Sequence, residues 1–264
     1  MRRALLLTTP CLALLLAFAA QSDLTIDFDE AGDPLAAVLA KHPKNAIVEG
    51  GGVDGSSGLR TTYVGGEMGS ERVVIQPRLD APLREATLSF DVRFDENFQF
   101  VRGGKLHGLG PTRPTSGGNP TKPEGWSVRL VWRSEGGLQT YVYDQRKTGK
   151  YGVVKPAEGF RFEPGRWYHL DLHVRVNEDP EAATGFAHVW VDGKKLIEHD
   201  DLQLRAEGGD ETLITRLLYS TFHGGNGPEW APKNADGSFA TVHANFDNFR
   251  IAAGGPPTTR PRPR

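Results

Sequence analysis

The chain has 264 residues, a formal net charge of −2 and 38% hydrophobic residues. With a mean hydropathy of −0.43, this composition excludes a membrane protein with many spanning helices and gives no sign of a general nucleic-acid binder. The single cysteine excludes an intrachain disulfide framework and a cysteine-rich zinc site.

Residues 1–22 have the features of a secretory signal peptide. Arg2 and Arg3 precede a short apolar stretch, and small residues around Ala19 offer a cleavage site. We predict a secreted or periplasmic protein that makes no stable membrane insertion after cleavage, which also removes Cys11. An uncleaved membrane anchor is the competing interpretation.

The far end of the chain, residues 254–264, is rich in proline and arginine and predicts a flexible tail. Residues 23–253 remain between the leader and the tail. Their number suits one large β-domain rather than two smaller ones.

Within that domain, most of the chain alternates polar and apolar residues instead of following a helical period. A short helix is predicted at residues 34–41, and strands are predicted at residues 86–94, 126–133, 139–145, 167–177 and 185–192. Asp192-Gly193 predicts a hairpin turn. The pattern indicates an all-β fold, an antiparallel β-sandwich of the jelly-roll type with a concave substrate cleft.

The strand at residues 167–177 illustrates ordinary patterning, with apolar residues on one face and polar residues on the other. Its polar face includes His169 and His173, which we expect to face solvent. The eight histidines nowhere combine with carboxylates at a recognisable ligand spacing, so we predict no metal site.

The strand at residues 126–133 carries an unusual polar face, with Ser127, Arg129 and Arg133 opposite an apolar one. The strand that follows places Gln139, Tyr141, Tyr143 and Gln145 on one face. If the two strands pair, these side chains form one continuous surface. An ordinary solvated sheet face is the alternative interpretation.

Charge is concentrated around the same residues. Residues 101–155 contain ten basic and three acidic side chains, whereas the rest of the 23–253 domain is acidic. A basic segment in an acidic domain favours a site for an anionic ligand other than nucleic acid. The glycine-rich stretch around Lys105 is not a phosphate-binding P-loop, because it lacks the Gly-Lys-Ser/Thr ending and no helical pattern follows. It fits better as a strand that delivers Lys105 to the surface described above.

Several short motifs occur together in this region: Gly103-Gly104-Lys105-Leu106-x-Gly108, Gly125-Trp126-Ser127-x-Arg129, Tyr141-x-Tyr143, Trp190-Val191-Asp192-Gly193, Ser220-Thr221-Phe222-x-Gly224-Gly225 and Phe246-Asp247-Asn248-Phe249. In their order and spacing the chain resembles polysaccharide lyase family 14, which includes alginate lyases and glucuronate-polymer lyases. The resemblance covers roughly Phe90 to Ile251. It departs from the family pattern at His107, where proline is usual, and at His223, where a second aromatic residue is expected.

The resemblance implies a jelly roll that binds an acidic polysaccharide and cleaves 4-linked uronates, as in alginate or glucuronan, by β-elimination without a cofactor. It implies catalytic roles for Lys105, Ser127, Arg129, Tyr141 and Tyr143. Arg129 suits the substrate carboxylate, Lys105 adds positive charge, and the tyrosines suit the proton transfers, in an order that the sequence does not assign. Further substrate contacts are expected from Arg102, His107, Arg133, Gln139, Gln145 and His223. We expect a monomer.

Three other functions remain open. A non-catalytic carbohydrate-binding jelly roll is the main alternative, because the same sandwich serves lectins and enzymes. A glycoside hydrolase would need two facing carboxylates, which the polar sheet face lacks. A structural envelope protein would leave the basic segment unexplained.

Overall fold

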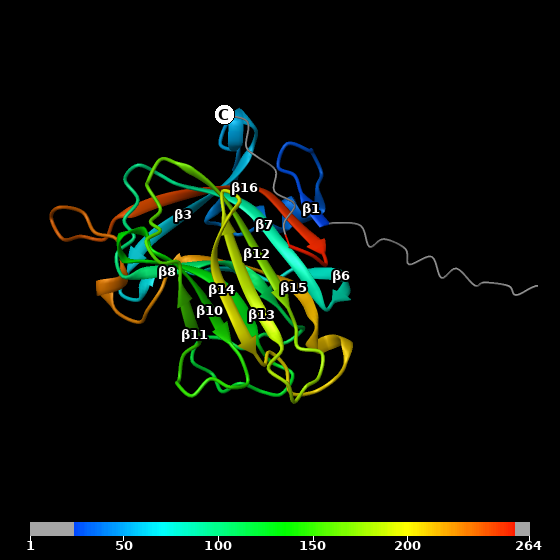
Figure 1. Ribbon diagram of the computed structural model, residues 1–264. Coiled ribbons are helices and arrows are strands. Elements are labelled where there is room, and N and C mark those ends of the chain that lie inside the picture. The colour runs from blue at the N-terminus through cyan, green and yellow to red at the C-terminus, as the bar shows by residue number, and fades with distance from the viewer. Residues whose placement is uncertain (1–23, 257–264) are drawn as a thin grey trace, which may run out of the picture.

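The computed structural model describes residues 24–256, so the predicted signal peptide and most of the predicted tail lie outside the described residues. Within this range the chain forms two antiparallel sheets that pack into a sandwich (Figure 1). None of the helices in the described part is long and apolar enough to span a membrane.

The larger sheet has nine strands within the described residues. Its order is β14 (Lys194–Leu202), β13 (Gly185–Val191), β12 (Trp167–Arg175), β7 (Glu85–Phe94), β16 (Thr241–Ala253), β3 (Gly58–Gly66) and β2 (Asn45–Val48). Two short strands complete it: β1 (Leu24–Ile26) pairs with β16, and β4 (Gly69–Ser70) pairs with β3.

The smaller sheet has seven strands in the same part of the chain. Its order is β11 (Val153–Pro156), β10 (Leu138–Tyr143), β9 (Ser127–Arg133), β8 (Gly103–Gly110), β15 (Ile214–His223) and β5 (Val73–Ile75), with β6 (Arg78–Leu83) also paired to β15. Helix α1 (Pro34–Ala40) begins at the N-cap Asp33, whose carboxylate accepts from the backbone N–H groups of Leu35 and Ala36. Between residues 24 and 256 there are also four short 3-10 turns: η1 (Val53–Gly55), η2 (Ser134–Gly136), η3 (Asp210–Thr212) and η4 (Pro228–Trp230).

The core fills the space between the two sheets. Strand β9 contributes Val128, Leu130 and Trp132, and aromatic rings bridge the layers: the rings of Phe94 on β7 and Trp132 on β9 meet edge to face at 5.6 Å. Full burial of a side chain of this size stabilises the fold by about 1.5–3 kcal/mol. The alternation that predicted a sandwich therefore reflects one face of each sheet turned inward.

The predicted fold class is confirmed, and the predicted elements match the observed ones closely. The helix predicted at 34–41 is α1, and the five predicted strands are β7, β9, β10, β12 and β13. Strand β10 ends at Tyr143, two residues before the predicted end, because Gln145 lies in the loop that follows. Strand β13 leads into β14 through the predicted turn at Asp192-Gly193.

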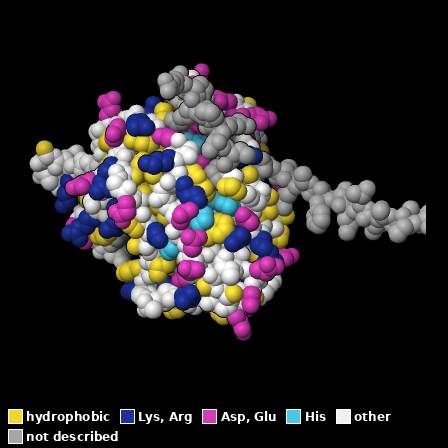
Figure 2. Space-filling view, viewed as in Figure 1, with side chains coloured by type: hydrophobic (Ala, Val, Ile, Leu, Met, Phe, Trp, Pro, Cys, Tyr) yellow, Lys and Arg dark blue, Asp and Glu magenta, His cyan; other side chains and the backbone are white. Residues whose placement is uncertain are grey.

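The outward face of the larger sheet is less solvated than its polar sequence predicts. His173 is 4% exposed beside Glu85, 2.7 Å away, and His169 bridges the carboxylates of Asp91 and Asp171. The prediction that His173 faces solvent is wrong, because neighbouring rings such as that of Phe186 cover it. Figure 2 shows histidines and charges of both signs intermingled over this sheet.

Candidate functional site

The five residues predicted to be catalytic lie on three adjacent strands of the smaller sheet, on the side turned away from the core. Tyr141 on β10 lies opposite Arg129 on β9, and Tyr143 lies opposite Ser127. Lys105 on β8 lies opposite Val131 of β9. We call this side of β8, β9 and β10 the site face.

Lys105 and Tyr141 are in direct contact at the centre of the site face. The Lys105 Nζ lies over the Tyr141 ring, 3.6 Å from its centroid, and both side chains are partly exposed. The hydroxyl of Tyr141 lies 3.3 Å from that of Tyr143. These two side chains are the members of the predicted catalytic set that a substrate can reach in this structure.

Arg129 and Ser127 form a buried support behind that pair. Arg129 is 4% exposed, and its guanidinium donates a 2.8 Å hydrogen bond to the Ser127 hydroxyl. Ser127 is fully buried and donates to the backbone oxygen of Thr115 at 2.6 Å. The serine hydroxyl is thus already engaged on both its donor and its acceptor side.

A covering loop, residues 111–125, closes over these buried groups. Its Gly118 N–H donates to the Tyr143 hydroxyl at 2.8 Å, and Tyr143 is fully buried. The side-chain amide of Gln145 donates to the backbone oxygens of Lys122 and Gly125 at 2.9 and 3.2 Å. Gln145 was expected to contact substrate, but its amide nitrogen instead fastens the covering loop.

Positive charge on the site face is not neutralised locally. Three arginines, Arg129, Arg133 and Arg72, lie close enough to Lys105 to act on its charge. None of the four cations forms an ion pair with a carboxylate within residues 24–256. Cations gathered without anionic partners create a strong local attraction for an anionic ligand.

The same environment shifts the pKa values of Lys105 and Tyr141, the two accessible residues of the predicted catalytic set. Burial, together with the positive charges of Arg129, Arg133 and Arg72, lowers the pKa of Lys105 to about 7. Burial and the hydrogen bond with Tyr143 raise the pKa of Tyr141 above its usual value, although Arg129 opposes the shift. Near neutral pH a substantial fraction of Lys105 is therefore uncharged, whereas Tyr141 keeps its proton.

His107 does not lie on the site face, contrary to expectation. It is fully buried in the core, where its ring stacks on Tyr219 at 4.2 Å and meets Phe246 at 4.7 Å. The reason is a β-bulge in β8: the four residues from Lys105 to Gly108 lie opposite only the three from Val131 to Arg129 on β9, so Leu106 and His107 both turn inward. The prediction that His107 contacts substrate is wrong.

His223 also lies in the core rather than at the surface. It stacks on Phe98 at 5.3 Å, and its Nε2 lies 2.7 Å from the backbone oxygen of Gln99. Its neighbour Phe222 pairs with Lys105, so alternation along β15 turns Phe222 to the site face and His223 inward. The expected substrate contact from His223 is therefore wrong as well.

The remaining predicted contacts lie at the edges of the site face. Gln139 is partly exposed opposite Val131. Arg133 is exposed at the end of β9, and Arg102 pairs with Glu229 at 3.5 Å.

Sequence reasoning missed two residues near Lys105. Arg72 reaches this region from the segment between β4 and β5, and Trp230 reaches it from η4. No local pattern predicts either placement, because the pairing of distant strands creates both.

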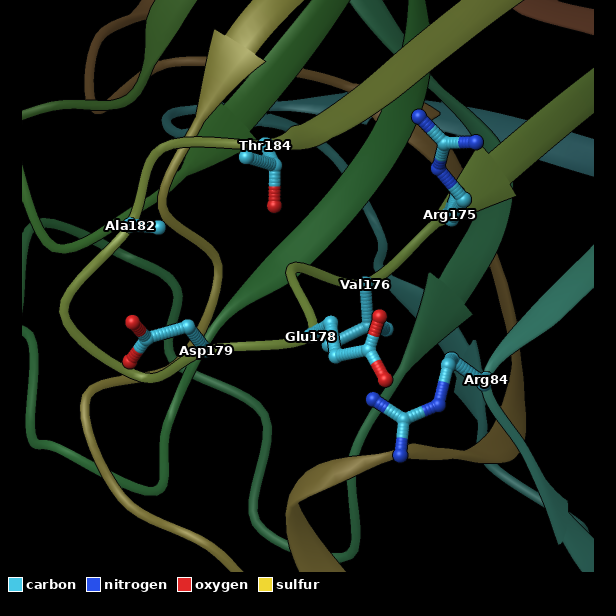
Figure 3. Close-up of a pocket in the computed structure, with 7 residues that line it drawn as sticks. All are labelled: Arg84, Arg175, Val176, Glu178, Asp179, Ala182 and Thr184. Carbon is cyan, nitrogen blue, oxygen red and sulfur yellow. The ribbon is translucent and has the colours of Figure 1, made fainter.

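Two hollows in the structure lie away from the site face. One, of about 430 Å³, is lined by Arg84, Arg175, Val176, Glu178, Asp179, Ala182 and Thr184 (Figure 3). The other, of about 480 Å³, borders Arg60, Arg93 and Asp95. Both linings mix acidic and basic side chains, so neither has the one-sided charge of the site face. No cluster of metal-binding side chains occurs in the described range.

Comparison with known families identifies the chain. The sequence profile of the family described as polysaccharide lyase 14 matches residues 67–249, which include all five predicted catalytic residues. The chain belongs to polysaccharide lyase family 14. The predicted resemblance is therefore confirmed, and the chain is a polysaccharide lyase. Comparison with curated proteins gave no match.

Solved structures share the fold at low sequence identity. A variant of alginate lyase Aly36B in complex with alginate trisaccharide aligns with a TM-score of 0.70 at 21% identity, covering 90% of this chain and 100% of that one. The PL-14 alginate lyase from Aplysia kurodai aligns at 0.64 and 21% identity, covering 89% and 99%. The endo-β-1,4-glucuronan lyase from Trichoderma reesei aligns at 0.56 and 16% identity, covering 81% and 89%.

Proposed function

We propose that this lyase cleaves 4-linked uronate polymers, alginate or glucuronan, by β-elimination at the site face. The observation that carries the proposal is the contact of Lys105 with Tyr141 among cations that have no carboxylate partner in the described residues. Such a site attracts a polyanion and presents it with one group that can accept a proton and one that can donate a proton. Solved structures of the same fold include alginate and glucuronan lyases, which supports this substrate class.

The reaction needs two proton transfers. The C5 proton of the uronate is removed, its electron pair forms the C4–C5 double bond, the C4–O bond breaks, and the departing oxygen takes up a proton. Uncharged Lys105 is suited to remove the C5 proton, because its pKa is lowered to about 7. Tyr141 keeps its proton and is suited to donate it to the departing oxygen.

This assignment replaces the expectation that one tyrosine accepts the proton and the other donates it. Tyr143 is enclosed, and its hydroxyl accepts a hydrogen bond from the covering loop, so we give it a positioning role toward Tyr141. Ser127 holds the Arg129 guanidinium by a hydrogen bond, and Arg129 adds the positive charge that stabilises the developing carboxylate anion.

The arrangement also favours particular uronates. Lys105 and Tyr141 project from the same face of one sheet and touch, so both approach the sugar from one side. Elimination then requires the C5 hydrogen and the C4 oxygen on the same side of the ring. Mannuronate and glucuronate units meet this requirement, whereas guluronate units carry the two groups on opposite sides.

The test is to incubate the full chain with polymannuronate, glucuronan and polyguluronate and to follow the ultraviolet absorbance of the new double bond. We expect cleavage of mannuronate or glucuronate polymers and little of polyguluronate. Tyr141→Phe should lower kcat by about 100-fold or more, as expected on losing a general acid. Tyr143→Phe should retain more activity than Tyr141→Phe. Binding of all three polymers without any absorbance change would favour a carbohydrate-binding protein instead.

We also propose that the protein is a monomer that acts outside the cytoplasm, in the periplasm or the medium. The export part of the proposal rests on the leader-like residues 1–22 and on the nature of the polymer, which is an extracellular material. N-terminal sequencing of the protein recovered from the periplasm and medium of an expressing bacterium tests the export. Size-exclusion chromatography tests the monomer. A product that starts at Met1, or a stable dimer, would contradict the corresponding part.

A further inference from the structure

We propose that Arg72 and Arg133 form a second carboxylate subsite, which binds the uronate unit next to the one that loses its C5 proton. This inference rests on the proposed function and adds a specificity element to it. Neither Arg72 nor the aromatic residue beneath Arg133 belongs to the set predicted from sequence.

Arg133 is held over an aromatic platform. Its guanidinium carbon lies over the ring of Trp230, 5.9 Å from the centroid. The Trp230 ring itself has a fixed position, because it lies directly against Gly225, where an added Cβ would fall 2.3 Å from three ring atoms. A cation over an indole ring is attracted by the negative face of the ring, which biases where Arg133 points.

Arg72 is held in a similar way. Its guanidinium carbon lies over the ring of Phe222 at 5.3 Å, and its Nη2 donates to the side-chain oxygen of Asn226 at 3.3 Å. Phe222 is the residue of β15 that pairs with Lys105. Arg72 therefore lies one strand away from Lys105, on the side opposite to Tyr141.

The two arginines are available for an anion. Both are exposed, and neither has an ion pair with a carboxylate in residues 24–256, whereas nearby Arg102 has Glu229. A guanidinium that is held in place and has unused donors suits bidentate binding of a carboxylate.

The spacing suits a polymer. Arg133 pairs with Gly103, two residues from Lys105 along β8, which corresponds to about 7 Å of strand. This offset is comparable to the length of one sugar unit. Arg72 reaches the same area, because it donates to Asn226, the neighbour of the Gly225 that packs against Trp230. A carboxylate bound between the two arginines would therefore belong to a unit adjacent to the reacting one. The subsite favours runs of consecutive uronates over polymers in which each uronate is flanked by neutral sugars.

The test compares Arg72→Gln, Arg133→Gln and the double variant with wild type on whichever uronate polymer wild type cleaves. We expect KM to rise about 3- to 10-fold in each single variant and further in the double variant, with kcat within about twofold, as for the loss of a charged contact made equally to substrate and transition state. Arg93→Gln is the matched control, since Arg93 lies over Trp167 at 4.9 Å on the larger sheet. It should leave both constants unchanged.

Two further measurements test whether the two arginines bind the carboxylate of the neighbouring uronate unit. On the same polymer with most carboxylates reduced to alcohols, wild type and the double variant should have equal KM values. Trp230→Ala should reproduce part of the KM increase of Arg133→Gln, while Trp230→Phe, which keeps an aromatic platform, should change KM less.

The possible failures are distinguishable. If wild type neither cleaves nor retards any uronate polymer in affinity electrophoresis, the proposed function fails and the subsite fails with it. If wild type cleaves but the double variant keeps its KM within twofold, only the subsite is refuted. A fall in kcat at constant KM would also refute it, because the arginines would then act on the transition state and not on a neighbouring unit.

Discussion

Variants at His107 test whether this residue lies in the core, as the structure has it, or contacts substrate, as the sequence predicted. The imidazole is fully buried among aromatic rings, and neither ring nitrogen has a hydrogen-bond partner among the described residues. Burial lowers the pKa of His107 to about 3, far below its usual 6.5. His107→Phe removes both the unpaired polar atoms and the titration, and His107→Gln removes the titration alone.

The expected size of the effect follows from the pKa. Because the folded-state pKa lies below the unfolded-state value, the unfolded chain takes up a proton below pH 6.5 that the folded chain refuses. Stability is therefore lost as the pH falls, by about 2 kcal/mol between pH 7 and pH 5 from this residue alone. This loss of stability depends little on the exact folded-state pKa, since His107 in the folded protein is still uncharged at pH 5. At pH 7, relief of the unpaired nitrogens should make His107→Phe more stable by about 1–3 kcal/mol.

Urea unfolding of wild type and both variants at pH 7 and pH 5 provides the measurement. His107→Phe should gain stability at pH 7, and its advantage over wild type should grow by about 2 kcal/mol at pH 5. His107→Gln should show the same reduced pH dependence without the gain at pH 7. Both should keep wild-type kcat and KM. An unchanged pH dependence, or a loss of activity with intact folding, would refute the placement of His107 in the core.

Three other predictions concern the site and the larger sheet. If Lys105 removes the C5 proton, kcat/KM should increase with pH through about 7 and reach a plateau, whereas a pH-independent rate would exclude Lys105 as the base. Burial opposes a charge on His169, but the hydrogen bonds and charges of its two aspartate partners outweigh it and raise the pKa to about 9. His169→Asn should therefore be less stable than wild type at pH 7, and urea unfolding should show the difference shrinking as the pH rises through 9. Gly225→Ala should lose about 1–3 kcal/mol in thermal unfolding, since the φ of +99° and the Trp230 ring both oppose a side chain there; an unchanged melting temperature would contradict the contact.

The sequence predicts the sandwich well because the alternation of polar and apolar residues along a strand shows which of its faces is buried. Val128, Leu130 and Trp132 mark the inward side of β9, so the outward placement of Arg129 follows without further information. The pairing of Tyr141 with Arg129 follows from a short connection between adjacent strands.

The error at His107 has its origin in the register of β8. Alternation places His107 beside Lys105, but the bulge in β8 inserts one residue and turns His107 inward. No residue in β8 predicts that bulge. Gly108 does not predict it either, because the glycine is required by close packing: an added Cβ would lie 2.0 Å from the backbone oxygen of Val128. The sequence does not predict the positions of Arg72 and Trp230 either, because they belong to segments that are distant from the site strands along the chain.

The bulge in β8 has a consequence for how related sequences are compared. It lets one strand serve the chemistry with Lys105 and the hydrophobic interior with His107, although the two are separated by a single residue. A difference from the family pattern at position 107 therefore reports how the interior is filled and carries no information about which polymer is cleaved. Conversely, deletion of one residue between Lys105 and Gly108 would match the two steps from Val131 to Arg129, so plain alternation would return with Lys105 still on the site face and one core side chain lost. A chain without the bulge could therefore keep its site face and differ from this one in the packing of its core.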